Sequence, residues 1–246
     1  MGKIMERTIG QIVADDYRSA SVFEKFGIDF CCTGNRSIKE ACEQKEINSE
    51  ELTKALEAAL AETTTVATDY KSWPLDLLAD YIEKKHHRYV EERIPIIKQY
   101  LDKLVKVHGA KHPELLMINE LFITSAGEFT MHMKKEELML FPFIRKMIRA
   151  KQSNETMNPP RFGTVKNPIQ TMMHEHDNEG ESFRQIKELS NNYTPPVDGC
   201  NTYKVTFALL KEFQDDLHVH IHLENNILFP KAEVLERELE ESKSIA

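Results

Sequence analysis

Apolar residues recur every three or four positions along most of residues 74–240, which is the pattern of helices that bury one face. Glycine, proline and asparagine residues that typically begin or end helices punctuate this pattern. It predicts four long helices at about residues 74–107, 113–150, 167–190 and 202–240. Four long helices joined by moderate connections favour an up-down-up-down bundle.

Three prolines fall inside the predicted helices, at Pro95, Pro142 and Pro230. Proline has no amide hydrogen, and its ring clashes with the preceding turn. We therefore expect each of the three to kink or end its helix.

The first 62 residues carry shorter helical patterns. Gly27 follows an amphipathic run as a helix end, Ser37–Glu40 fits a capping box, and another helix is expected to begin near Asn48. A polar, β-branched, aperiodic segment follows and is typical of a linker. We therefore divide the chain into a small helical domain at residues 1–62, a linker at 63–72 and the bundle at 73–246.

The composition supports an all-α protein, since leucine, glutamate, lysine and alanine are abundant and only 9 of 246 residues are glycine. A formal net charge of −8 argues against a nucleic-acid-binding surface. The sequence has no apolar leader and no uncharged stretch long enough to cross a bilayer, so we expect no membrane partner. Four cysteines do not form a disulfide framework for a chain of this size, and the cytoplasm is the expected compartment.

One motif occurs twice, as His132-x-x-x-Glu136 and His220-x-x-x-Glu224, and each copy is followed by Leu-Phe-Pro after three further residues. Residues four apart share a helix face, so each copy directs an imidazole and a carboxylate toward one point. A single copy is usually a solvated surface pair. Both copies interrupt stripes that face the core, where uncompensated polar groups cost roughly several kcal/mol each. The repeat therefore predicts a buried metal site.

The other two long helices also offer histidines to such a site. His176 lies on the apolar line of the third predicted helix, whereas the periodicity of the first fits either His86 or His87. His174, His218 and His222 are expected to be solvated or to lie outside the ligand set. Nitrogen-rich ligation with carboxylate bridges favours iron, and manganese or a mixed pair stays open.

Two adjacent cysteines, Cys31 and Cys32, are expected on a loop or at a helix start. A thiol near a helix N-terminus has a lowered pKa and is reactive, and adjacent cysteines rarely form a disulfide. In a cytosolic protein the pair indicates metal handling, nitrosylation or a thiol relay. The alternative is two small apolar residues in a minor core. Cys42 and Cys200 are expected to be structural.

Together these features resemble the repair-of-iron-centres family, the di-iron proteins that repair iron–sulfur clusters. The resemblance rests on Phe30–Gly34 in a small helical domain followed by a hemerythrin-like bundle, and it covers nearly the whole chain. Its most specific stretches are residues 8–32, 132–142, 175–177, 191–196 and 223–230.

The resemblance implies a non-haem centre of two iron ions with an oxo or hydroxo bridge. It implies six ligands, with terminal imidazoles and bridging carboxylates: His87, His132, His176, His220, Glu136 and Glu224. It favours His87 over His86, which the periodicity does not. By position, Glu128 and Glu175 resemble acidic residues beside the family's route to the irons, and Cys31 and Cys32 become candidate functional thiols.

The family restores iron–sulfur clusters damaged by nitric oxide or oxidants. The resemblance therefore implies a cytoplasmic stress-response protein that donates iron, reacts with NO at its centre, or does both. Its expected partners are damaged iron–sulfur proteins, NO or O₂, and a second copy of itself.

Two alternatives are a hemerythrin-like sensor that binds O₂ or NO without repair, and a di-iron enzyme that reduces NO. A simple oxygen carrier has no need of residues 1–62, which favours repair.

Overall fold

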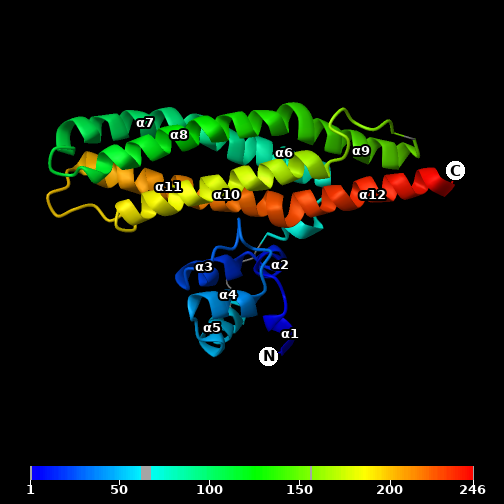
Figure 1. Cartoon of the computed structure of the whole chain (residues 1–246), viewed down its shortest axis with the longest axis horizontal. Coiled ribbons are helices and arrows are strands. Elements are labelled where there is room, and N and C mark those ends of the chain that lie inside the picture. The colour runs from blue at the N-terminus through cyan, green and yellow to red at the C-terminus, as the bar shows by residue number, and fades with distance from the viewer. Residues whose placement is uncertain (1, 62–67, 156, 246) are drawn as a thin grey trace. The chain divides into compact units, whose positions relative to one another are not determined.

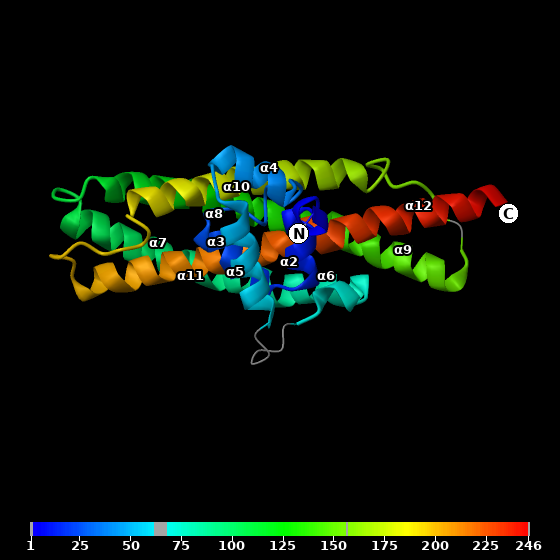
Figure 2. The same cartoon turned by 90° about the horizontal axis from the view of Figure 1, so that it is seen from below.

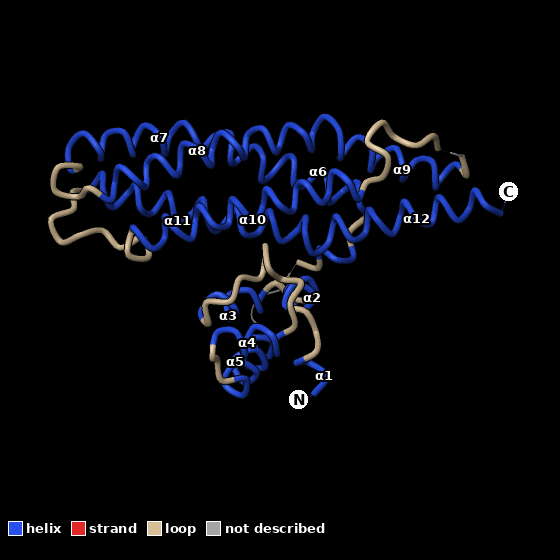
Figure 3. The backbone as a smooth tube through the Cα atoms, in the orientation of Figure 1, coloured by secondary structure: helices blue, strands red, loops and turns tan. Residues whose placement is uncertain are grey.

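The structure is a computed structural model that describes residues 2–61, 68–155 and 157–245, and most of these residues are helical (Figure 1). No strand forms among the described residues, where an isolated bridge joins Thr8 and Ser37 (Figure 3). The all-α prediction is confirmed. No helix in the described part of the chain has both the length and the apolar character needed to span a bilayer.

The described chain divides into two compact units, residues 79–220 in one and residues 1–78 with 221–246 in the other. Of the linker predicted at residues 63–72, residues 63–67 lie outside the described residues, and Tyr70–Ser72 forms a 3₁₀ turn, η1. The domain boundaries proposed from the sequence therefore stay predictions.

The unit of residues 79–220 is built on four long helices that run alternately in opposite directions (Figures 1 and 2). This confirms the predicted up-down bundle. After the short α6 (Leu75–Tyr81), the elements in chain order are η2 (Ile82–His87), α7 (Arg88–His108), α8 (Glu114–Lys135), η3 (Glu136–Leu140), α9 (Phe141–Ser153), α10 (Lys166–Leu189) and α11 (Asn201–Leu223). Helix α8 packs against both α7 and α10.

An aromatic cluster fills the core between α8, α10 and α11. The Phe213 ring centroid lies 5.5 Å from those of Phe122 and Phe183. All three rings are buried, and each contributes roughly 1.5–3 kcal/mol through the hydrophobic effect.

Each proline was expected to kink or end its helix, and none of the three ends a helical run. Helix α7 continues through Pro95, and Pro142 follows the π-helical turn η3. The second copy of the motif repeats this arrangement, because Pro230 follows the π-helical turn η4 (Glu224–Leu228) and lies in α12 (Phe229–Ile245). In η3 and η4 the Phe141 and Phe229 amides donate to carbonyls five residues back, those of Glu136 and Glu224. Each proline has no N–H to donate, and the wider turn before it lets the helix continue without that hydrogen bond.

The other unit contains the short helices α1 (Gly2–Met5), α2 (Ile9–Asp15), α3 (Arg18–Lys25), α4 (Ile38–Lys45) and α5 (Ser49–Ala61), together with η4 and α12. The predicted capping box is confirmed, since Ser37 and Glu40 accept each other's backbone N–H. Gly27 has φ +67° after α3, as the helix end predicted there requires.

Gly10 fixes where α2 meets η4 within this unit. Its amide donates to the Gly34 carbonyl at 2.7 Å, and a Cβ added to it would lie 2.0 Å from Asn226 Oδ1. Only glycine therefore permits this close approach.

Candidate metal centre

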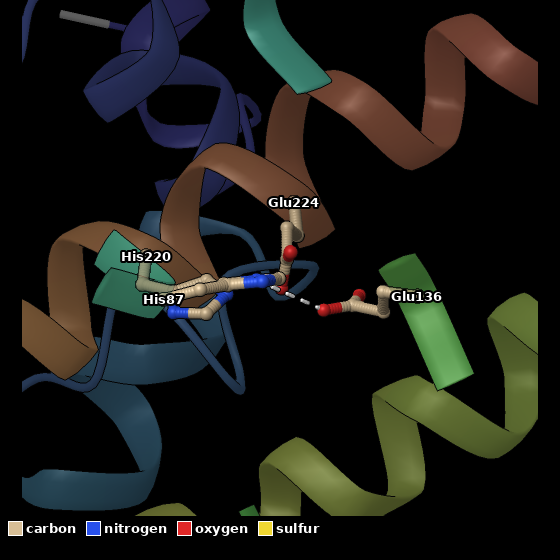
Figure 4. Close-up of side chains that lie close together, drawn as sticks. All are labelled: His87, Glu136, His220 and Glu224. Atoms are coloured by element: carbon tan, nitrogen blue, oxygen red, sulfur yellow. Dashed lines mark ion pairs between the residues drawn. The ribbon is translucent and has the colours of Figure 1, made fainter. Parts of the chain in front are cut away.

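Six buried side chains, the ones expected from the repeated motif and the resemblance, form two groups that share both carboxylates. One group is His87, Glu136, His220 and Glu224, drawn in Figure 4, and the other is His132, Glu136, His176 and Glu224. Within each group the candidate ligand atoms lie within 4.8 Å of one another. Both groups therefore offer imidazole and carboxylate ligands that could hold a metal ion.

Glu136 lies between the imidazoles of the two groups. Its Oε2 is 3.4 Å from His87 Nε2 and also 3.4 Å from His132 Nε2 (Figure 4 shows the His87 pair). The side chain is 0% exposed, and neither carboxylate oxygen accepts a hydrogen bond from any residue that the structure describes. A buried carboxylate in this state is strongly destabilising unless a cation compensates it, so these residues fit a metal.

Hydrogen bonds on the outer side of the imidazoles set their tautomers. His132 Nδ1 bonds Glu175 Oε2 at 2.9 Å, and His87 Nδ1 bonds Glu137 Oε1 at 2.9 Å. Since each Nδ1 donates its hydrogen to a carboxylate, each Nε2 keeps a lone pair that a cation can use. His132 Nε2 also lies 3.0 Å from His176 Nε2, the imidazole in its own group. The hydrogen bond from His132, reinforced by Lys135, lowers the pKa of Glu175 to about 2 against the effect of burial. Glu137 was not predicted from the sequence, in which its one signal was its place beside Glu136.

Widened helical turns occur at three of the candidate ligands. His87 ends the π-helical segment η2, Glu136 begins η3 and Glu224 begins η4. An inserted π turn rotates the residues after it relative to those before it. These turns let each helix keep its apolar face in the core on both sides of the polar ligands.

His86 and His87 are both buried, but they differ in their surroundings. His87 belongs to a candidate ligand group, whereas His86 Nδ1 bonds Asp216 Oδ1 at 3.0 Å and belongs to no such group among the described residues. The structure therefore places His87 at the centre, in agreement with the resemblance.

His222 was expected to be solvated or to lie outside the ligand set; it belongs to neither candidate ligand group among the described residues, and it is buried rather than solvated. Its side chain is 1% exposed and packs against the Tyr17 and Phe30 rings, and burial lowers its pKa to about 3. These contacts join residues far apart in the sequence, so helical periodicity could not reveal them. His174 is exposed, and His218 is half-buried beside Gln214.

A cavity of about 470 Å³ lies on the bundle between α8 and α10, and it is lined by Glu128, Glu175 and six further residues. One of these, Glu179, did not emerge from the sequence analysis. It is 3% exposed and accepts a hydrogen bond from Ser125, and burial raises its pKa to about 7. Glu128 and Glu175, which the resemblance predicts beside a route to the metal centre, thus line the same cavity.

Cys31 and Cys32 lie on a loop between α3 and α4, with Cys31 buried and Cys32 half-buried. The reactive, low-pKa thiol expected at a helix start is not found at Cys31. Its hydrogen bond with Cys32 and its burial raise its pKa instead. Cys200 was expected to be structural but is exposed, and hydrogen bonds from the Tyr203 amide and His108 lower its pKa to about 7.

Two family models match this chain. Residues 5–60 match ScdA_N, described as a domain of unknown function (DUF542), and residues 78–232 match the Hemerythrin HHE cation binding domain. The bundle and its shared carboxylates therefore define a hemerythrin-like cation-binding protein with a metal site.

Similar curated proteins extend over both matched regions. The iron-sulfur cluster repair protein ScdA of Staphylococcus haemolyticus is 31% identical over 227 residues, which cover 92% of this chain and 97% of the relative. The iron-sulfur cluster repair protein YtfE of Musicola paradisiaca is 34% identical over 232 residues, covering 92% and 96%, and that of Escherichia coli O8 is 33% identical over 227 residues, also covering 92% and 96%. This chain belongs to the family of iron–sulfur cluster repair proteins.

Proposed function

We propose that this protein repairs iron–sulfur clusters damaged by nitrosative or oxidative stress, using a centre of two iron ions. The observation that carries the proposal is the buried Glu136 carboxylate between the imidazoles of two ligand groups, in a chain whose relatives are named for cluster repair. The proposed ligands are the six buried residues His87, His132, Glu136, His176, His220 and Glu224.

The donor set supports iron that can be given up. Imidazole and carboxylate suit iron, and without thiolate they hold it less firmly than a cage of cysteines does. When bound, the iron pair supplies ferrous ions for transfer and a site for reaction with NO or O₂.

The surrounding residues orient the ligands and exclude water. Glu175 and Glu137 accept hydrogen bonds from the Nδ1–H groups of His132 and His87, so that both Nε2 atoms remain available to a cation. Phe129 and Phe141 stack against these same two imidazoles. The cavity that Glu128 and Glu175 line is the proposed route between solvent and the centre.

The remaining parts of the proposal rest on the family resemblance. Cys31 and Cys32 contact the damaged iron–sulfur protein, NO or O₂ is the small-molecule ligand, and the protein acts in the cytoplasm as a homodimer.

Two histidines on α10, two residues apart, provide a matched test. His176 is buried in a candidate ligand group, whereas His174 is exposed. After iron loading, we expect His176→Ala to lose iron and to fail to restore activity to an iron–sulfur enzyme whose cluster NO has damaged. His174→Ala should match the wild type in both measurements.

The same assay separates the alternatives. Turnover of NO to N₂O without cluster recovery indicates an NO reductase, and reversible NO or O₂ binding without recovery indicates a sensor. Full iron content in His176→Ala would contradict the ligand assignment.

A further inference from the structure

Three side chains of types that can bind metal lie close together on the loop between α3 and α4. They lie outside the candidate centre of four histidines and two glutamates, called the His/Glu centre below. The Asp29 carboxylate and the Cys31 and Cys32 thiols each offer a ligand atom within 4.8 Å of the other two. The two Sγ atoms are 3.6 Å apart, and Cys31 Sγ is 3.4 Å from Asp29 Oδ1. This is too far for a disulfide and close enough for one ion to touch all three.

These separations are close to those that a tetrahedral ion imposes. With metal–sulfur bonds of about 2.3 Å and tetrahedral angles, two sulfur ligands lie roughly 3.7–3.8 Å apart. A sulfur and a carboxylate oxygen bound to the same ion lie roughly 3.5 Å apart. The loop thus needs only small side-chain adjustments to bind a cation.

Hydrogen bonds hold the backbone of this loop in place. Asp29 Oδ1 accepts the backbone N–H of Cys31 at 3.0 Å and that of Cys32 at 2.9 Å. From η4, Asn225 Nδ2 donates to the Cys31 carbonyl at 3.2 Å, and Asn226 Nδ2 donates to the Phe30 carbonyl at 3.3 Å. A rigid support of this kind favours binding because little order has to be created when the ligand arrives.

We propose that Asp29, Cys31 and Cys32 form a second cation site for one thiophilic divalent ion, such as Zn²⁺ or Fe²⁺, with a fourth coordination position open. Each thiol loses its proton to solvent as its metal–sulfur bond forms, so binding releases two protons and involves no redox step. The open position suits an ion that is passed to a thiolate of another protein. That use, unlike the site itself, rests on the proposed repair function.

Cobalt(II) is the probe that separates this site from the His/Glu centre. We expect the full-length, iron-loaded protein, titrated anaerobically with Co²⁺, to bind one ion with a sulfur-to-cobalt charge-transfer band in the near ultraviolet. Imidazoles and carboxylates cannot produce that band, so unchanged iron content with a new band locates cobalt at cysteine. About two protons should be released per ion.

Variants identify the cysteines and the carboxylate. Cys32→Ser, at a half-buried position, should abolish the band. Asp29→Asn keeps an oxygen that can accept the two backbone N–H groups, and it should weaken cobalt binding roughly 10- to 100-fold. Cys200→Ser is the matched control, because Cys200 is exposed and its Sγ lies 3.2 Å from His108 Nε2, and it should keep the band.

A wild-type protein without the band would overturn the proposal. So would a band that survives Cys32→Ser or disappears in Cys200→Ser. His176→Ala should retain the cobalt band while losing iron, so failure of the His/Glu centre and failure of this site give different results.

Discussion

Glu136 belongs to both candidate ligand groups and is completely buried, so the proposed two-ion centre depends on it. We expect Glu136→Ala to lose both metal ions, whereas His220→Ala, which removes a member of one group, should lose about one of two. Metal per chain, measured by mass spectrometry, checks both expectations. Glu120→Ala, an exposed change on the same helix α8, should retain both ions. One ion retained in Glu136→Ala would contradict the shared position.

Glu179 should make the stability of the metal-free protein depend on pH. Burial raises its pKa from 4.5 to about 7, so the folded state binds its proton more tightly than the unfolded state does. The stability that protonated Glu179 contributes is therefore fully present below about pH 4.5, and it is lost as the pH rises through 7. Glu179→Gln stays neutral and should avoid this loss, which amounts to roughly 3 kcal/mol at most.

Urea unfolding of the metal-free proteins at pH 5, 6, 7 and 8 provides the measurement. The advantage of Glu179→Gln should grow with pH, while Glu181→Gln, an exposed change on the same helix, should show no such gain. Identical pH profiles for wild type and Glu179→Gln would show that this carboxyl is not buried.

At the level of helices, replacing each of two glycines with alanine should change the stability of the protein in opposite directions. In Gly10→Ala the new Cβ would lie 2.0 Å from Asn226 Oδ1, so Asn226 must move from the bonds that hold Phe30 and His222. We expect a loss of roughly 1–3 kcal/mol in stability and faster labelling of Cys31 and Cys32 by a thiol reagent. Gly127, on α8, has open space around its Cβ position, so Gly127→Ala should gain about 0.5–1 kcal/mol.

Thermal unfolding and mass-resolved thiol labelling distinguish the two glycine variants. Equal labelling rates in Gly10→Ala and the wild type would show that the α2–η4 contact does not protect the cysteine loop.

The long helices could be predicted from the sequence because their signals are local. The helix ending at His108 is followed by Gly109, and the helix beginning at Glu114 is preceded by Pro113. The π-helical turns could not be predicted, because each shifts the apolar pattern by about one residue, and a spacing that alternates between three and four residues hides such a shift. Pro142 and Pro230 were the visible trace of two of them, and they were interpreted as kinks or helix ends.

At the scale of the whole molecule, metal should stabilise the fold. Removing it leaves Glu136 and the imidazoles around it buried without their compensating charge. With free metal at about 100 times its dissociation constant, binding adds roughly 2.7 kcal/mol, which raises Tm by roughly 5–10 °C for a chain of this size. Calorimetry of loaded and metal-free protein measures this shift. His176→Ala should show much less of it, and equal Tm values in the wild type would contradict a buried metal centre.

The fold class could be predicted from helical periodicity along most of the chain, and the family from a resemblance that covers nearly all of it. The contacts that set the surroundings of the candidate site could not. His222 is covered by Tyr17 and Phe30, and Glu179 meets Ser125, through packing between residues far apart in the sequence. Helical periodicity also fitted His86 and His87 equally well as candidate ligands, and their contacts in three dimensions distinguish them.

The turn η4 performs two tasks with consecutive residues. Glu224 contributes a carboxylate to both ligand groups, and Asn225 donates to the carbonyl of Cys31. One residue inserted between them would rotate Asn225 by about 100° around the helix axis and carry its amide away from that carbonyl. A homologue that retains both arrangements must therefore keep this short stretch free of insertions and deletions, however much the rest of its final helix diverges.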